Sequence, residues 1–227
     1  MENTLVRAVR TGLAELADPA KAPEMQRYMK SELPFRGVPK PRRQTFTRRV
    51  FAEFPLPDSE AVTAAVRELW HEARFREERY VATDLTGYRT YLHWQDASWL
   101  SLYEELIVTG AWWDHVDELA ARRIGPLLRA DPAAVRPKVR RWAQDTDRWL
   151  RRTAVICQLG SKAHTDTELL TYAIESTVDD PDFFLRKAIG WALREHAKTD
   201  PDWVLRFVGE HPGLSPLSRR EATKHLH

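Results

Sequence analysis

Residues 110–117 read GAWWDHVD, and this stretch predicts the start of a helix around which the rest of the chain is organised. Its spacing puts Trp113 and Asp117 at i and i+4, so the indole ring and the carboxylate share one face about one turn apart. Trp112 and Val116 form a second such pair, which is apolar and is expected to turn inward. The Trp113/Asp117 pair then faces a groove or solvent, where it can stabilise positive charge. Helix packing and capping are the alternative explanation.

Helical patterns continue along the whole chain on both sides of this stretch. The 227 residues include only 9 glycines and show little strand-like alternation, which indicates an all-α protein. Asn3 and either Asp58 or Ser59 are expected to cap helices, and the prolines within residues 33–41 exclude a continuous helix there. The predicted helices cover residues 5–16, 19–29, 42–54, 59–70, 75–88, 94–108, 112–128, 135–142, 149–159, 167–174, 183–197, 203–209 and 217–226.

Short Asp-Pro and Gly breaks join these helices into pairs that recur roughly every 35–40 residues. That pattern favours a HEAT-like helical-repeat solenoid whose concave face carries the partner surface. A globular helical bundle is the alternative. No long linker separates domains, so we predict a single domain over residues 1–227.

Composition excludes several classes of protein. The chain is 43% hydrophobic, which suits a sizeable core, and its one cysteine, Cys157, excludes a disulfide framework and fits a reducing compartment. No apolar run approaches the ~18 residues of a membrane span, and the N-terminal sequence lacks the features of a signal peptide. We therefore expect a soluble, cytoplasmic protein that has no contact with a membrane. The ends of the predicted solenoid look polar, so we also expect a monomer.

The net charge is only +2, but the arginines are distributed in a way that suggests a partner. Doublets spread along an elongated body could line one basic face, as in proteins that bind nucleic acid. Solvated helix faces paired with Asp and Glu are the alternative. The doublets are Arg42-Arg43, Arg48-Arg49, Arg122-Arg123, Arg140-Arg141, Arg151-Arg152 and Arg219-Arg220.

The eight histidines do not form a metal-binding pattern. They are scattered, with no His-Glu-x-x-His motif and no cysteine partner, so structural or surface roles are expected and no metal or cofactor is predicted. They are His71, His93, His115, His164, His196, His211, His225 and His227.

Several further motifs, kept in order along the chain, resemble the DNA alkylation repair (AlkD-type) alkylpurine glycosylases. The matching segments are MQRYMK (25–30), FRGV (35–38) with PRR (41–43), EELIVT (104–109) leading into WWDHVD (112–117), RKAIGWALRE (186–195), AKTDP (197–201) and LSRREA (217–222). The resemblance implies a HEAT-like solenoid that grips duplex DNA in a basic concave channel. It also implies hydrolysis of the N-glycosidic bond of cationic N3- and N7-alkylated purines without flipping the base.

Carried over residue by residue, the resemblance places the catalytic residues at Asp117, Trp113 and Trp191. It places a DNA-binding arginine of the neighbouring helix at Arg152. The other expected DNA-binding residues are Lys187, Arg194, Lys198, Arg219, Arg43, Tyr28 and Lys30. The partner would be alkylated double-stranded DNA, in keeping with a protein associated with the bacterial nucleoid.

The expected chemistry needs negative electrostatics more than an acid. An alkylpurine is already a good leaving group because it is cationic, and positive charge moves to the deoxyribose as the bond breaks. Trp113 and Trp191 can supply cation–π stabilisation, and Asp117 can stabilise the oxocarbenium ion and orient or deprotonate water. A non-catalytic binder of damaged DNA and a protein-interaction scaffold are the alternatives. Whether the lesions are methylated bases or bulky natural-product adducts stays open.

Overall fold

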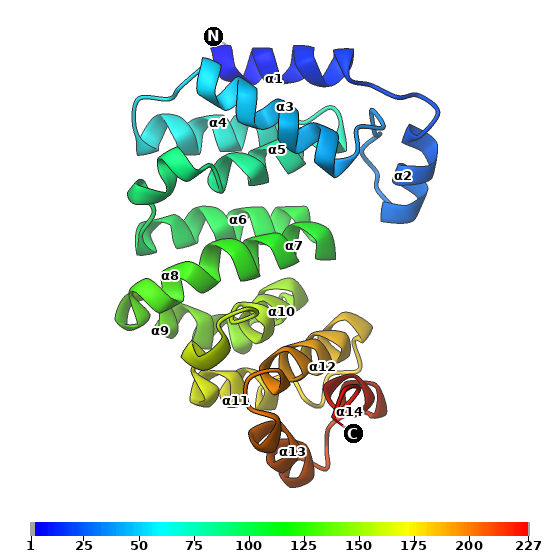
Figure 1. Cartoon of the computed structure of the whole chain (residues 1–227), viewed down its shortest axis with the longest axis vertical. Helices are drawn as coiled ribbons and strands as arrows, with labels where there is room; N and C mark the ends of the chain where they lie inside the picture. The colour runs from blue at the N-terminus through cyan, green and yellow to red at the C-terminus, as the bar shows by residue number, and fades with distance from the viewer. Residues whose placement is uncertain (1–2, 227) are drawn as a thin grey trace. The chain divides into compact units, whose positions relative to one another are not determined.

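The computed structural model describes residues 3–226 of the chain and contains helices and turns but no β-strand within that range. Figure 1 shows the order of the helices along the chain. The prediction of an all-α helical-repeat fold is therefore confirmed. The chain divides into two compact units, residues 1–95 and 96–227, which are described separately. The prediction of a single domain over residues 1–227 stays a prediction.

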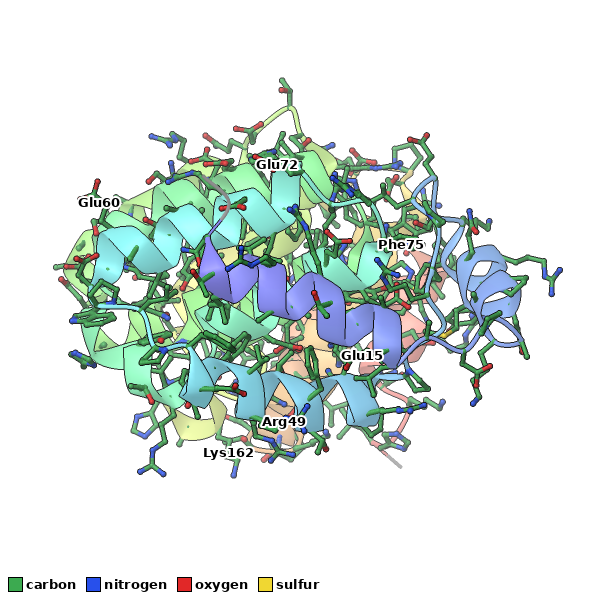
Figure 2. All side chains as sticks on the ribbon, turned by 90° about the horizontal axis from the view of Figure 1, so that it is seen from above. Glu15, Arg49, Glu60, Glu72, Phe75 and Lys162 are labelled. Carbon is green, nitrogen blue, oxygen red and sulfur yellow. The ribbon has the colours of Figure 1, made fainter. Side chains whose placement is uncertain are left out.

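The first unit packs its helices around α1. Leu5, Val6 and Val9 of α1 are fully or nearly fully buried, and the helix contacts α3, α4 and α5. Figure 2, which looks onto α1, shows the labelled Arg49 and Glu60 on the outer sides of α3 and α4, where both are exposed. The helices are α1 (Thr4–Glu15), α2 (Ala22–Met29), α3 (Lys40–Glu53), α4 (Ser59–His71), α5 (Arg76–Thr86) and the 3-10 helix η1 (Arg89–Trp94).

A buried carboxylate holds the proline-rich loop of the first unit. Glu77 on α5 has no exposed surface, and its oxygens accept hydrogen bonds at 2.9–3.1 Å from the backbone N–H groups of residues 36, 37 and 38. Gly37 has φ +82°, and a Cβ there would lie 2.1 Å from the carbonyl oxygen of Asp18. The loop is therefore an ordered connection that requires glycine at this position.

The second unit is built around α10, whose residues are almost all buried. This helix packs against α7, α9 and α12, while α12 in turn packs against α13 and α14. The elements are η2 (Ala97–Trp99), α6 (Leu100–Gly110), α7 (Trp113–Leu119), the π-helical turn η3 (Ala120–Ile124), α8 (Gly125–Ala130), α9 (Pro132–Ala143), α10 (Arg148–Ile156), η4 (Lys162–His164), α11 (Thr167–Glu175), α12 (Phe183–Ala197), α13 (Pro201–Glu210) and α14 (Pro216–Ala222).

Side-chain caps set many of the helix starts. Asn3 and Asp58 accept hydrogen bonds from the backbone of the first turns of α1 and α4, as predicted. Asp131, Asp166 and Asp200 cap α9, α11 and α13 in the same way. The aspartates at the sequence breaks therefore satisfy backbone donors that would otherwise lack partners.

The predicted continuous helix over residues 112–128 is wrong in its bounds and its regularity. Trp112 is the N-cap of α7, and the α-helical hydrogen bonding gives way to the π turn before resuming in α8. Pro126 has no N–H to donate, and a Cβ on Gly125 would lie 2.3 Å from the carbonyl oxygen of Cys157. The close approach of α10 and the missing donor account for the irregular turn.

Other predicted bounds shift by a turn or less, with two larger differences. The predicted helix over residues 94–108 begins at Leu100, because two short 3-10 segments precede it. The last helix ends at Ala222 rather than at residue 226. The helix over residues 183–197 has the predicted bounds.

Candidate active site

The Asp117 carboxylate of α7 meets the guanidinium of Arg152 on α10. Arg152 Nε donates to Asp117 Oδ1 at 2.8 Å, and Nη2 donates to Oδ2 at 2.8 Å. This is the bidentate, charge-assisted arrangement that fixes the plane of a carboxylate. Both residues belong to the second unit and lie 35 positions apart in the sequence. The pairing therefore aims the Asp117 carboxylate in one direction.

The Arg152 side chain is buried and bonded to other groups inside the protein. It is only 5% exposed, and its third nitrogen, Nη1, donates to the carbonyl oxygen of Phe184 at 2.6 Å. Phe184 lies in the first turn of α12, so Arg152 connects α7 and α12 through α10. A guanidinium held on three sides in this way is better suited to positioning Asp117 than to gripping a phosphate.

The Asp117 carboxylate itself stays at the rim of this buried pair, with 16% of its side chain exposed. Burial raises its pKa above the ordinary value of 3.8, and the hydrogen bonds and charge of Arg152 oppose that shift without reversing it. The charge of Asp114 adds to the increase. A carboxylate with a raised pKa holds a proton more readily, as a general base must.

The two tryptophans of the sequence prediction lie on helices that pack against the same central helix. Trp113 begins α7, one turn before Asp117, and is half-buried. Trp191 lies in the middle of α12 and is also half-buried, although Ala192 and Leu193 beside it are buried. Both α7 and α12 contact α10. The tertiary structure thus gathers the elements of all three predicted catalytic residues around α10.

An aromatic cluster supports the helix ends at this site. The ring of Trp112 lies 6.1 Å from Trp149 and 5.6 Å from Phe184, and Trp149 lies 5.0 Å from Phe184 between ring centroids. Trp149 is only 2% exposed, so its ring packs inside the protein. The sequence analysis did not single out Phe184. The cap residue Asp182 places Phe184 in the first turn of α12, but no local pattern names Arg152 as its partner.

Ion pairs on α10 reinforce the connection to α12. Arg151 pairs with Asp180 at 2.6 Å, and Arg148 pairs with Asp182 at 3.1 Å. The doublet Arg151-Arg152 is therefore paired with acidic groups of the protein, although the buried Arg152 does not lie on a solvated helix face.

The basic residues expected to contact DNA in the second unit also have partners within the chain. Lys187 and Arg194 both pair with Glu221, while Lys198 pairs with Glu195 in an exposed i, i+3 contact. Arg219 donates from Nη1 to the carbonyl oxygen of residue 208 and from Nη2 to that of residue 211.

Those of the first unit fall into two groups. Arg43 is 5% exposed and pairs with Asp84 at 2.8 Å, which places it in the core of the unit. Tyr28 at the end of α2 is 75% exposed, and Lys30, the left-handed C-cap of that helix, is exposed as well. Tyr28 and Lys30 are thus the two expected DNA-binding residues of the first unit that are exposed.

The comparisons with known proteins identify the family of the chain. The family model for DNA alkylation repair enzymes matches residues 9–226. The chain belongs to the DNA alkylation repair enzyme family. A solved structure described as a predicted DNA alkylation repair enzyme from Enterococcus faecalis is 31% identical and covers 92% of this chain and 96% of its own, with a TM-score of 0.82. No curated protein matches the chain.

Membership of this family supports a role in the repair of alkylated DNA. Within residues 3–226, no group of three or more His, Cys, Asp or Glu side chains is arranged to hold a metal ion. His227 lies outside the described residues. None of the described helices is long and apolar enough to cross a membrane.

Proposed function

We propose that this protein is a DNA glycosylase that hydrolyses the N-glycosidic bond of cationic N3- and N7-alkylated purines in duplex DNA. The observation that carries the proposal is the Asp117 carboxylate, held by two hydrogen bonds from Arg152 and placed one helical turn after Trp113. Family membership supports alkylated DNA as the substrate, and the charges at the site suit this reaction.

The reaction begins with cleavage of the bond between C1′ of the deoxyribose and the purine nitrogen. The bonding electron pair goes to the base, which loses its positive charge and leaves as a neutral purine. Positive charge develops on the sugar as an oxocarbenium ion. In the proposed geometry, the ionised Asp117 stabilises this ion and the rings of Trp113 and Trp191 offer their negative faces to it.

Water completes the hydrolysis. Its oxygen bonds to C1′, and Asp117 accepts the proton that the water loses, leaving an abasic site. The raised pKa of Asp117 favours this proton transfer. Arg152 keeps the carboxylate aimed and stays charged beside it, so we assign it a positioning role rather than the phosphate contact expected from the sequence.

The remaining basic residues would contact the DNA backbone. Tyr28 and Lys30 are exposed and ready for such contacts. Lys187, Arg194, Lys198 and Arg219 would have to exchange internal partners for phosphates, at least in part. Phosphate contacts position the protein without reading sequence. We propose that the protein acts as a monomer and attacks the lesion without extruding the base.

The test is the release of 7-methylguanine from methylated duplex DNA by the wild type and by Asp117→Asn. We expect release by the wild type and a rate about 10²–10³-fold lower for the variant, with DNA binding retained. Glu118→Gln is the matched control, because it removes a carboxylate from the next position of α7, where Glu118 pairs with Arg123.

The other outcomes separate the alternatives. Binding of the methylated duplex without release by the wild type would indicate a non-catalytic binder of damaged DNA. Neither release nor binding would indicate a protein-interaction scaffold.

A further inference from the structure

The last helix of the chain packs unusually closely against the helix that carries Trp191. A Cβ on Gly190 of α12 would lie 2.5 Å from the Cβ of Glu221 and 3.0 Å from the carbonyl oxygen of Ser218, both in α14. The hydroxyl of Ser218 donates to the carbonyl oxygen of Arg186 at 2.9 Å. Glycine next to Trp191 thus allows the backbone of α14 to reach α12 directly.

Glu221 uses this closeness to bridge two cations of α12. Its carboxylate accepts a hydrogen bond from Lys187 Nζ at 3.0 Å through one oxygen and contacts Arg194 Nη1 through the other. Lys187 lies four residues before Trp191 and Arg194 three residues after it. These spacings put both cations on the same face of α12 as Trp191. Lys187 lies about one turn before Trp191, and Arg194 lies about one turn after it.

The charges of this arrangement matter for a cationic substrate. Lys187 and Arg194 carry two positive charges within about one helical turn of a ring proposed to stabilise a third, and like charges repel. Glu221 reduces the local charge from +2 to +1. Its carboxylate side chain is only 15% exposed, and the hydrogen bond from Lys187, with further help from Arg194, lowers its pKa, so it is ionised at neutral pH.

We infer that Glu221 is a positioning residue for the glycosylase reaction, which bridges Lys187 and Arg194, orients α12 around Trp191 and lowers the positive charge that the cationic alkylpurine meets. This inference rests on the proposed function. It also predicts a trade-off: the same ion pairs that favour the cationic lesion withhold two cations from the phosphates of DNA.

Helix packing alone is the competing explanation, and it makes a different prediction. A purely structural Glu221 would affect release, binding and stability in the same direction. An electrostatic Glu221 would affect release and binding in opposite directions, because the sugar–base centre is cationic and the DNA backbone is anionic.

The experiment compares Glu221→Gln with the wild type in single-turnover release of 7-methylguanine and in binding of unmodified duplex DNA over a salt series. Glutamine keeps the shape and hydrogen-bonding capacity of the side chain but removes its charge. We expect release to slow by roughly 3–30-fold. We expect DNA binding to tighten at low salt, with the salt dependence steeper by about one phosphate contact.

Glu168→Gln is the matched control, because Glu168 lies on α11 and not on the helix that carries Trp191. It removes one carboxylate, and its partner Arg136 keeps a second acceptor in Asp166. It changes the net charge as Glu221→Gln does and should leave the rate of release unchanged. A slower release that is seen in Glu221→Gln and not in the control would therefore result from the electrostatics around Trp191 rather than from the net charge of the protein.

Lys187→Met tests the inference in the opposite direction, because it removes a positive charge near Trp191 where Glu221→Gln removes a negative one. This test does not depend on whether Glu221→Gln folds. It leaves Glu221 to neutralise Arg194 and lowers the positive charge around Trp191, so single-turnover release at saturating enzyme should be faster, while DNA binding weakens and its salt dependence becomes shallower. Thermal melting of each variant checks that it is folded.

The results distinguish this inference from the proposed function. Release by the wild type combined with an unchanged rate for Glu221→Gln would overturn the inference alone, as would parallel losses of release, binding and melting temperature. A wild type that releases no base would overturn the proposed function and the inference with it.

Discussion

The pair of Arg152 and Asp117 leads to a specific prediction for Arg152→Gln. The variant removes the guanidinium whose hydrogen bonds and charge lower the pKa of Asp117, while burial and Asp114 continue to raise it. The pKa of Asp117 should therefore rise further. Because the ionised carboxylate performs the proposed reaction, the acid limb of the pH–rate profile should move to higher pH.

The size of the shift can be estimated from the contact. Two unit charges about 4 Å apart interact by about 4 kcal/mol at an effective dielectric constant near 20. The Asp117 side chain keeps 16% of its surface exposed, so solvent screens part of this interaction. We expect a shift of about 1–2 pH units.

Stability should change with pH in a related way. A carboxylate whose pKa is raised in the folded state contributes stability below its unfolded pKa, and this contribution is lost as the pH rises through the folded pKa. Arg152→Gln raises the pKa of Asp117 in the folded state further, so it enlarges this dependence of stability on pH. The variant should be destabilised by about 2–4 kcal/mol at neutral pH, where an ionised Asp117 lacks its partner, and by less in acid.

The assay is single-turnover release of 7-methylguanine from about pH 5 to about pH 9, with release in the absence of enzyme subtracted. Arg148→Gln is the control, since Arg148 lies on the same helix but pairs with Asp182. An acid limb that stays in place in Arg152→Gln, together with weaker DNA binding, would refute this reasoning and return Arg152 to the phosphate contact.

Four further results are expected from other parts of the molecule. Trp191→Leu should slow release by about 2–30-fold in the same single-turnover assay, the range of one cation–π contact. Gly190→Ala should lower the free energy of unfolding by about 1–3 kcal/mol in urea titration, because its Cβ would lie 2.5 Å from α14. Glu77→Ala should cost about 3 kcal/mol or more by the same measurement, because three backbone donors lose their buried acceptor. Cys157, whose pKa is raised to about 12 by burial, should react with thiol reagents only when the protein unfolds; rapid labelling of the native protein would contradict its buried position.

Helical periodicity and capping chemistry are local, and the sequence predicted them well. The caps at Asn3 and Asp58, the break at residues 33–41 and the helix over residues 183–197 all follow from contacts within one or two turns. The π turn was missed because it depends on α10, whose Cys157 carbonyl approaches Gly125 from more than thirty positions away. Such an approach leaves no trace in the periodicity of residues 112–128.

The sequence by itself determined the all-α class, the family resemblance and the joint placement of Trp113 with Asp117, since an i, i+4 pair shares a helix face wherever the helix packs. Only the tertiary structure decided which cations the carboxylates meet. Arg152 belongs to Asp117, and Glu221 joins Lys187 to Arg194, because helices far apart in the chain pack side by side. A guanidinium looks the same in sequence whether it will face a phosphate or a buried carboxylate. Burial and distance distinguish the two, and both arise only when the helices are assembled.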